Sequence, residues 1–454
     1  MMASIVYHYA FWIYSLLIML IRLLKEIFKA NAPMGAGSPF VLRAEYQRGA
    51  QIIAFAAPSQ GGALKSHLLE NLKPFEDLAK STVIIDLSQD GWLDELIVAL
   101  REPVWFAVSH FGAGEVVSLA DGQVINPWLD GCVPFLRIYG DLPAYFPFRH
   151  LQGFNNSVNV YAHPEHYDFF VKRMSAPILS MCMDTCLFDE RPESDVDFLK
   201  KAKHGKLIFL KNGNSPVALK SYWLRHLPKK ISTVLMLLAE SLDGALDVSV
   251  DLYECVCDAF AESKISIHNN HKLIFFMCAQ LDDYMRRVKS NMLANVLLDY
   301  PVVIRGANWS HVDFSGKSAI YDPGCDYEGS RSLIDDALAI VDMSPNVLKA
   351  PHDRVLRAAG RYTTFFSNKQ DFYLDNFCFH EKFTFNFDVE SIRERIEYAL
   401  LNAQDVVEMG REQAITMRKL LTTRDYVEGI LGAVDTSVMI NSARPVGTQD
   451  FVLY

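Results

Sequence analysis

The feature that most constrains the fold of this chain is an alternation of short apolar runs with amphipathic segments. The first series of apolar runs covers residues 51–57, 82–87, 104–112, 134–141, 158–163 and 177–183. Helical patterns lie between several of them, for example at 63–80 and 164–173. Continuous apolar strands that alternate with helices are typical of a parallel sheet covered on both faces. The sequence therefore predicts an α/β fold.

A second series of the same kind begins at residue 206, after a polar segment, and includes the runs 302–309 and 337–343. The chain has 454 residues, which is too long for one ordinary core. We therefore expect two Rossmann-like domains that face a cleft. The expected boundaries are an N-terminal hydrophobic or amphipathic helix at 1–30, a linker at 31–50, a first domain at 51–190, a linker at 191–205, a second domain at 206–425 and a tail at 426–454.

The N-terminal segment differs from the rest of the chain. Residues 5–21, IVYHYAFWIYSLLIMLI, carry no formal charge, and Arg22, Lys25 and Lys29 follow them. The run is at the lower limit of what crosses a bilayer. Three interpretations remain open: a membrane anchor or interfacial helix, a helix packed on the body or on a partner subunit, and a secretory signal. With an anchor flanked this way, we expect a cytoplasmic body, peripheral to or anchored at the membrane.

Charge and cysteine usage exclude some classes of function. The net charge is −10, whereas a general nucleic-acid binder needs a basic surface, so we expect no nucleic-acid partner. The eight cysteines do not follow a metal-binding spacing and are typical of reduced, buried thiols. The pairs Asp282-Asp283 and Asp335-Asp336 fall inside helical patterns and are interpreted as solvated helix faces. We therefore expect no metal site.

The segment 341–368 combines a strand, a loop and a helix start in the order that makes an anion site. An apolar strand leads into Asn346, and His352, Asp353 and Arg354 open the next helix. The free N–H groups of a helix N-terminus point outward, and the helix dipole favours negative charge there. We expect this segment to hold a nucleotide diphosphate.

Several motifs, taken in order, resemble a known family. They are IFLKNGN at 208–214, VIRGANW at 303–309, the segment 340–346, HDRVL at 352–356 and YGDLP at 139–143. Together they resemble GT-B glycosyltransferases of the group-1 type, in particular CgeB-like spore-maturation proteins. The resemblance covers about residues 205–425 in detail and the first domain in outline. One position departs from the family, because Arg357 stands where an acidic residue usually contacts the ribose.

The resemblance implies a metal-independent glycosyltransferase that uses a nucleotide diphosphate-sugar as substrate and no other cofactor. The second domain would hold this donor, and the first domain would hold a protein, glycan or lipid-linked acceptor. Cations and helix N-termini would stabilise the charge that develops on the leaving diphosphate. The candidate donor-binding residues are Lys211, Asn212, Gly213, Arg305, Gly306, Asn346, His352, Asp353 and Arg354. His110 and Asp141 follow strand ends in the first domain and are the candidate catalytic bases.

Other interpretations of these residues remain open. His352 and Asp353 are also compatible with an ordinary first turn of a helix, and 211–213 with an ordinary strand-to-helix turn. At the level of the whole chain, a GT-B-like fold without activity could serve as a binding or scaffold protein, which the departure at Arg357 favours. An epimerase of nucleotide-sugars could use the same cleft.

Overall fold

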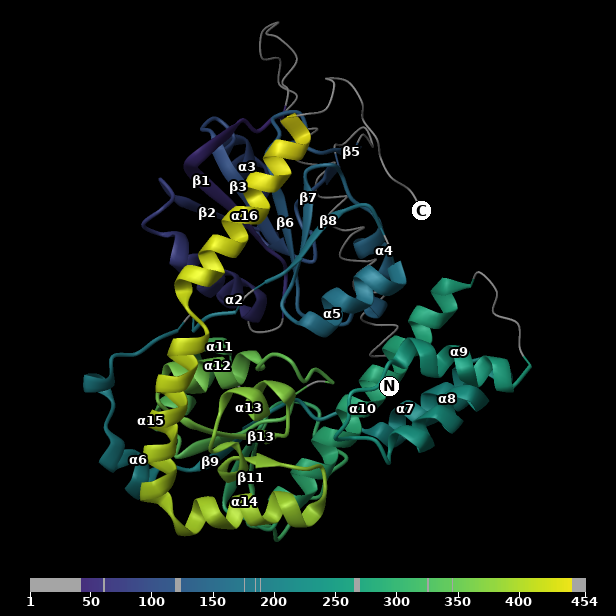
Figure 1. The fold of residues 1–454 in the computed structure, drawn as a ribbon, viewed down its shortest axis with the longest axis vertical. Helices are drawn as coiled ribbons and strands as arrows, with labels where there is room; N and C mark the ends of the chain where they lie inside the picture. The colour runs from purple at the N-terminus through teal and green to yellow at the C-terminus, as the bar shows by residue number, and fades with distance from the viewer. Residues whose placement is uncertain are drawn as a thin grey trace, which may run out of the picture.

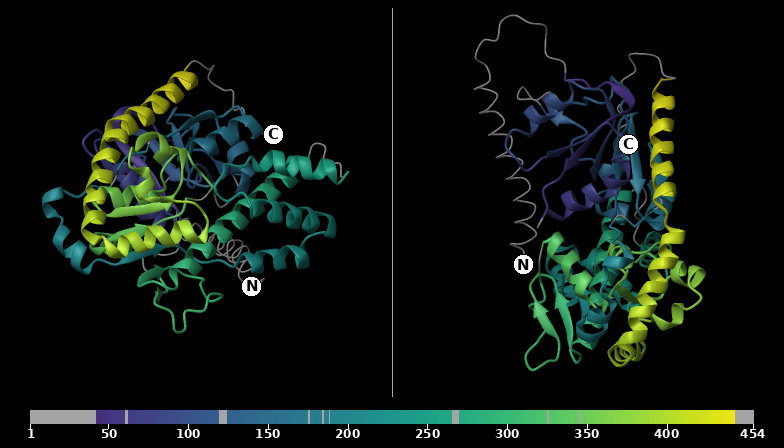
Figure 2. Two further views of the ribbon diagram at one scale, coloured as in Figure 1. Left: turned by 60° about the horizontal axis from the view of Figure 1, so that its bottom comes forward. Right: turned by 90° about the vertical axis from the view of Figure 1, so that its left-hand side faces the viewer.

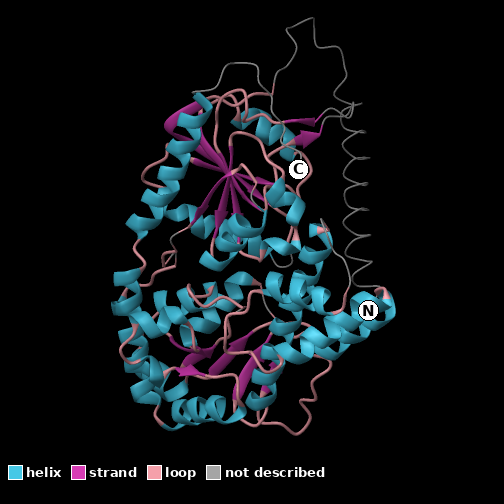
Figure 3. Ribbon diagram, turned by 45° about the vertical axis from the view of Figure 1, so that its right-hand side comes forward, coloured by secondary structure: helices cyan, strands magenta, loops and turns pink. Residues whose placement is uncertain are grey.

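The computed structural model describes residues 42–59, 62–118, 124–174, 176–183, 185–187, 189–264, 270–324, 326–344 and 346–442. Within this part of the chain, two parallel sheets of six strands each lie one above the other along the long axis (Figure 1). Helices surround both sheets (Figure 3). The expected mixed α/β architecture with two Rossmann-like domains is thus confirmed. The helix expected at 1–30 lies outside the described residues.

The first sheet has the strand order β2-β1-β3-β6-β7-β8. Every residue of the central strand β3 is buried, as expected for a strand covered on both faces. The strands are β1 (Tyr46–Ala56), β2 (Thr82–Asp86), β3 (Val104–His110), β6 (Phe135–Tyr139), β7 (Ser157–Tyr161) and β8 (Leu179–Cys182), and a hairpin of β4 (Val117–Ser118) and β5 (Val124–Ile125) lies apart. The helices include α2 (Ala63–Leu72), α3 (Trp92–Ala99), α4 (Pro147–Leu151) and α5 (Pro164–Phe169).

The second sheet has the order β11-β10-β9-β12-β13-β14, with β9 and β12 at its centre. Its strands are β9 (Leu207–Leu210), β10 (Val302–Arg305), β11 (Ile320–Asp322), β12 (Ala339–Val341), β13 (Thr364–Asn368) and β14 (Thr384–Phe385). Its helices are α11 (Tyr327–Asp336), α12 (Asp353–Gly360), α13 (Asp371–Asn376), α14 (Val389–Leu401) and α15 (Ala403–Leu420). The segment expected at 341–368 is therefore strand, loop, helix α12 and strand β13.

A bundle of four helices is inserted between β9 and β10: α7 (Pro216–His226), α8 (Lys229–Leu242), α9 (Leu252–Glu262) and α10 (His271–Leu297). The bundle shares a hydrophobic core with the first domain, in which Phe260 and Met277 of the bundle join Tyr139, Tyr161 and Phe170. It extends beside the two domains (Figure 1). The bundle therefore belongs to the second domain in sequence, but it packs against the first domain.

The last helix, α16 (Thr423–Ser442), returns to the first domain, where the sequence predicted a tail from residue 426. Tyr426, Ile430 and Val434 recur at helical spacing and pack into the core of the first sheet. The Tyr426 hydroxyl donates to the backbone oxygen of Asn71 at 2.9 Å. Figure 2 shows α15 and α16 running along both domains. The predicted linker at 191–205 likewise contains a helix, α6 (Phe198–His204).

Of the helices that the structure describes, none combines the length and the apolar composition needed to cross a membrane.

Candidate functional site

The loops that follow the strands of the two sheets meet at the domain junction. Glu165, at the start of α5 after β7, accepts hydrogen bonds from the backbone N–H groups of Leu348 at 2.7 Å and Lys349 at 2.8 Å. Asp141, after β6, accepts a hydrogen bond from Arg286 of α10 at 3.1 Å. Ligands of open α/β sheets bind outside the carboxyl ends of the strands. The junction is therefore the candidate ligand-binding site.

Arg354 is fixed at the carboxyl end of β12. Its Nε donates to Asp342 Oδ1 at 2.7 Å, and its Nη2 donates to the backbone oxygen of Met343 at 3.3 Å. Asp342 is buried, so this carboxylate orients the guanidinium firmly. His352 is the N-cap of α12 and accepts a hydrogen bond from the Arg354 N–H at 3.4 Å. Arg354 Nη1 makes no hydrogen bond to the described residues and remains available for an anion.

Lys211 follows β9, the strand next to β12, and is half-buried. Within the described part of the chain, its ammonium makes neither a hydrogen bond nor an ion pair. Burial, together with the charges of Arg354 and Arg286, lowers the pKa of Lys211 to about 7, although the carboxylates of Asp342 and Asp353 act in the opposite direction. A buried cation without a partner is costly unless an anion arrives. Lys211, Arg286 and Arg354, which we call the cation cluster, are therefore the candidate residues for contact with a negatively charged ligand.

Arg286 completes this cluster from the helix bundle. Its Nε lies 2.7 Å from Asp282 Oδ2, and burial opposes its charge, but Asp282 and Asp141 raise the pKa of Arg286 above its ordinary value. Asp282 is 3% exposed, so the solvated face predicted for the pair Asp282-Asp283 is wrong for its first member. The reason is that the first domain covers this side of α10, where Tyr145 donates to Asp282 at 2.8 Å. Asn346 Nδ2 also donates to Asp282, at 2.7 Å, which places Asn346 beside the cluster.

The loops after β9 and β10 approach each other so closely that glycine is required at two positions. Gly306 has φ +152°, and a Cβ there would lie 2.1 Å from the backbone oxygen of Lys211. A Cβ on Gly213 would lie 2.2 Å from the ring of Trp309. The loops after β9 and β10 therefore touch, and larger residues at either position would push them apart. Their glycines therefore have a structural role in bringing the two loops together.

Two further predicted donor residues are occupied by contacts within the second domain. Arg305 Nη1 pairs with Asp322 Oδ2 at 2.9 Å, toward the edge strand β11. Asn212 Oδ1 accepts a hydrogen bond from the Ala307 N–H at 2.8 Å. Both side chains hold the loops together, so neither is free for the cation cluster.

Arg357, the departure from the family pattern, is held by acidic and aromatic groups from both domains. It pairs with Asp353, and its guanidinium carbon lies 4.2 Å from the ring centroid of Tyr327. The Tyr327 hydroxyl donates to Glu70 of α2. Burial opposes the charge on Asp353, but His352 and Arg357 hold the pKa of its carboxyl well below the ordinary range. Asp353 is thus an anion that neutralises Arg357, one turn before it on α12.

The first domain presents two neutral imidazoles to this junction. His110 ends β3 and is 4% exposed, and its Nε2 lies 3.1 Å from Nδ1 of His67 on α2. Burial lowers the pKa of His110 to about 3 and that of His67 to about 4, so both are uncharged at neutral pH. Asp353 raises the pKa of His67, and Arg357 and His352 lower it. His67 is therefore in contact with His110 on one side and near the charged groups of α12 on the other.

The residues that sequence reasoning missed are Glu165, His67 and Arg286. Glu165 stands near a strand end, in the motif AHPEH, so its position was a usable signal. His67 and Arg286 lie inside helical patterns, where periodicity identifies the core face but not the face turned toward another domain. The predicted base Asp141 is half-exposed and bound to Arg286, which places it at the rim of the cation cluster.

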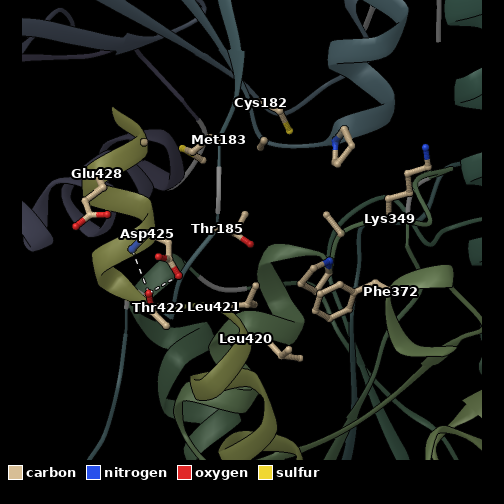
Figure 4. Close-up of a pocket in the computed structure, with 15 residues that line it drawn as sticks. Cys182, Met183, Thr185, Lys349, Phe372, Leu420, Leu421, Thr422, Asp425 and Glu428 are labelled. Atoms are coloured by element: carbon tan, nitrogen blue, oxygen red, sulfur yellow. Dashed lines mark hydrogen bonds between the residues drawn. The ribbon is translucent and has the colours of Figure 1, made fainter. Parts of the chain in front are cut away.

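A cavity of about 510 Å³ borders the loop between β12 and α12 (Figure 4). It is lined by residues of both domains and of α16: Ala162, Pro164, Cys182, Met183, Thr185, Lys349, Ala350, Pro351, Phe372, Leu420, Leu421, Thr422, Asp425, Glu428 and Gly429. Its acidic groups have structural partners, since Asp425 accepts from the Thr422 hydroxyl at 2.6 Å and Glu428 pairs with Arg424 at 2.7 Å. The cavity does not include the cation cluster, so it is not the candidate site.

The described residues hold no group of three or more His, Cys, Asp and Glu side chains arranged to bind a metal ion.

Neither a family model nor a curated protein matches this chain. Similar solved structures include Anabaena Alr3699/HepE in complex with UDP and glucose, at 9% identity over 86% of this chain and 100% of that chain, with a TM-score of 0.45. Sucrose-phosphate synthase from Thermosynechococcus elongatus is 9% identical over 86% of this chain and 99% of that chain, with a TM-score of 0.45. AviGT4, a glycosyltransferase involved in avilamycin A biosynthesis, is 11% identical over 86% of this chain and 98% of that chain, with a TM-score of 0.45. At these identities and TM-scores, nothing about the activity of this chain follows from them.

Proposed function

We propose that this protein is a glycosyltransferase that takes a sugar from a nucleoside-diphosphate sugar. The observation that carries the proposal is the ammonium of Lys211, which has no partner among the described residues and lies half-buried beside Arg354 and Arg286 at the strand ends of the second domain. Asp342 and Asp282 already balance the charges of Arg354 and Arg286, so an anion would pair with Lys211 and accept hydrogen bonds from the guanidinium groups. A diphosphate is such an anion, and the ordered motifs of the second domain resemble those of a nucleotide-sugar domain.

The chemistry follows from where the charge develops. During transfer, the bond between the anomeric carbon and a phosphate oxygen breaks, and its electron pair leaves with the diphosphate. The acceptor oxygen forms the new bond to the anomeric carbon and gives up its proton. Cations that are fixed before the reaction stabilise the leaving group without reorganisation. Arg354, oriented by the buried carboxylate of Asp342, is fixed in this way, so no metal ion is required in this proposal.

The pKa of Lys211 fits this role. At a pKa of about 7 the free protein holds Lys211 partly neutral, which limits the cost of burying three cations together. An incoming diphosphate favours the ammonium form and raises this pKa, so that the cluster becomes fully charged when the donor binds. The acceptor then approaches from the first domain, whose imidazoles are neutral.

The test is an assay of nucleotide release with a panel of nucleoside-diphosphate sugars. We expect release of a nucleoside diphosphate that increases when a suitable acceptor is added, and that falls about 100-fold in Arg354→Ala by analogy with the loss of one charge-stabilising donor. Binding of nucleotides without turnover would favour the scaffold alternative. Isomerisation of the sugar without release would favour an epimerase, and either result contradicts the proposal.

We further propose that the body of the protein is cytoplasmic and that residues 1–30 contact a membrane or a partner subunit, because of the apolar run at 5–21 and its basic flank. Deletion of residues 1–30 should move the protein from the membrane fraction to the soluble fraction of a lysate. An unchanged distribution would contradict the membrane contact.

A further inference from the structure

Three phenylalanines gather at the strand ends of the first domain, and we call Phe111, Phe146 and Phe148 the aromatic platform. Phe111 follows β3, and its ring centroid lies 6.1 Å from that of Phe146. The guanidinium of Arg149 lies 5.0 Å from the ring of Phe146 and 6.0 Å from that of Phe148. The Phe148 side chain is 55% exposed, which is unusual for a ring of this size. Phe148 is thus the exposed ring of the platform, whereas Phe111 and Phe146 are half-buried.

The backbone at Phe111 is strained. It has φ +59°, a left-handed conformation that bulky residues rarely adopt. Its N–H still donates to the backbone oxygen of Ile138 at 3.1 Å, so the strand pairing persists into the strained residue. The turn directs the ring onto Tyr139, with centroids 6.1 Å apart. Strain of this kind is commonly found at ligand sites, where the position of a side chain matters more than its cost.

One continuous segment joins the platform to the cation cluster. It begins at Asp141, which pairs with Arg286, and continues through a short 3₁₀ helix (Pro143–Tyr145). The Arg286 guanidinium lies 5.6 Å from the ring of Tyr145, and Phe146 follows directly. A ligand stacked on the platform is therefore held by the same segment that contacts one of the donor-binding cations.

We propose that the aromatic platform is an acceptor subsite that binds a sugar ring of a glycan. This inference rests on the proposed function, and it names the acceptor class. The flat C–H faces of a pyranose stack on aromatic rings, which expose faces of partial negative charge. The half-exposed carboxylate of Asp141 lies at the end of the segment that faces the donor site, where it can accept a hydrogen bond from an acceptor hydroxyl. The net charge of −10 disfavours a nucleic-acid acceptor.

The experiment is a glycan array probed with labelled full-length protein, followed by titration with the sugars that bind. The variants are Phe148→Ala and, as a matched control, Tyr321→Ala, which removes an aromatic side chain that is 37% exposed on the edge strand β11. We expect wild type and Tyr321→Ala to bind the same glycans, and Phe148→Ala to bind them roughly tenfold more weakly, as expected for loss of a stacking ring. Nucleoside diphosphates should bind all three proteins equally.

The two proposals fail differently. If nucleoside diphosphates bind but no glycan does, or if Phe148→Ala binds glycans as well as wild type, the platform is not the acceptor subsite. Binding of peptides or DNA in place of glycans would also overturn it. If glycans bind through Phe148 but no nucleoside diphosphate binds, the platform stands as a glycan site and the proposed transferase function fails.

Discussion

The two sides of the domain junction respond differently to the same burial. On the first domain, burial lowers the pKa of His67 to about 4 and that of His110 to about 3, so these groups lose their charge. On the second domain, Arg354 and Arg286 are paired with the carboxylates of Asp342 and Asp282, and Asp282 raises the pKa of Arg286 although burial opposes its charge. Lys211 lies between these extremes. The junction therefore has one side that carries guanidinium groups and one side whose imidazoles are neutral, which is the division that the proposed donor and acceptor sites require.

Of the variants considered, removal of Arg354 should have the largest effect on the cationic side of the junction. We expect Arg354→Ala to weaken donor binding or turnover by about 100-fold or more. It also leaves the buried carboxylate of Asp342 without its partner, which should destabilise the protein by about 3–5 kcal/mol. Donor titration and chemical denaturation measure the two effects.

The control is Arg354→Ala combined with Asp342→Asn. The neutral amide does not need a cation, so much of the lost stability should return while donor binding stays weak. Recovery of donor binding in this double variant would mean that Arg354 acts through the fold and not on the ligand.

The pH dependence of donor binding should sharpen the role of Lys211. With a pKa of about 7 in the free protein, binding above that pH requires uptake of a proton, so the affinity should fall by up to about tenfold per pH unit. The groups that act on Lys211 from α10, α12 and the end of β12 are Arg286, Arg354, Asp353 and Asp342. Calorimetry across this range measures the effect.

The matched variant is Lys211→Arg, because arginine remains charged throughout this range. Its affinity should be nearly constant between pH 7 and 9. An affinity of the wild type that is equally flat would show that the titration of Lys211 plays no part in binding.

The sequence predicted the strands that carry this asymmetry, because a buried parallel strand is a continuous apolar run that can be recognised without a structure. It also named as candidates Lys211, which follows a strand, and Arg354, which lies in the first turn of a helix; their contact with a ligand stays a prediction. Glu165 illustrates the limit. Its partners Leu348 and Lys349 are 183 and 184 residues away, and no local pattern encodes a contact between domains. Asp282 shows the same limit, because the first domain buries a helix face that periodicity alone assigns to solvent.

The contact of Glu165 with the second domain should matter for stability more than for donor binding. Glu165→Ala leaves the N–H groups of Leu348 and Lys349 without a partner, which should cost about 1–3 kcal/mol of unfolding free energy. Glu165→Gln keeps an acceptor oxygen and should lose less. Thermal and chemical denaturation of the two variants provide the comparison, and equal losses would contradict a role as hydrogen-bond acceptor.

The smallest effect is expected from the neutral side of the junction. His67→Gln removes an uncharged imidazole that does not belong to the cation cluster, so nucleotide affinity should change by less than about threefold. Turnover with acceptor is measured in parallel. A large loss of nucleotide affinity in His67→Gln would contradict the division between a cationic donor side and a neutral acceptor side.

The most direct test of the cation cluster is calorimetric titration of wild type and Lys211→Ala with UDP, GDP, ADP, CDP and dTDP at pH 6.5. The account predicts that at least one nucleoside diphosphate binds the wild type and that Lys211→Ala binds it about 100-fold more weakly, since one charge-assisted contact to the diphosphate is lost. Absence of binding to the wild type, or equal binding to both proteins, would contradict it.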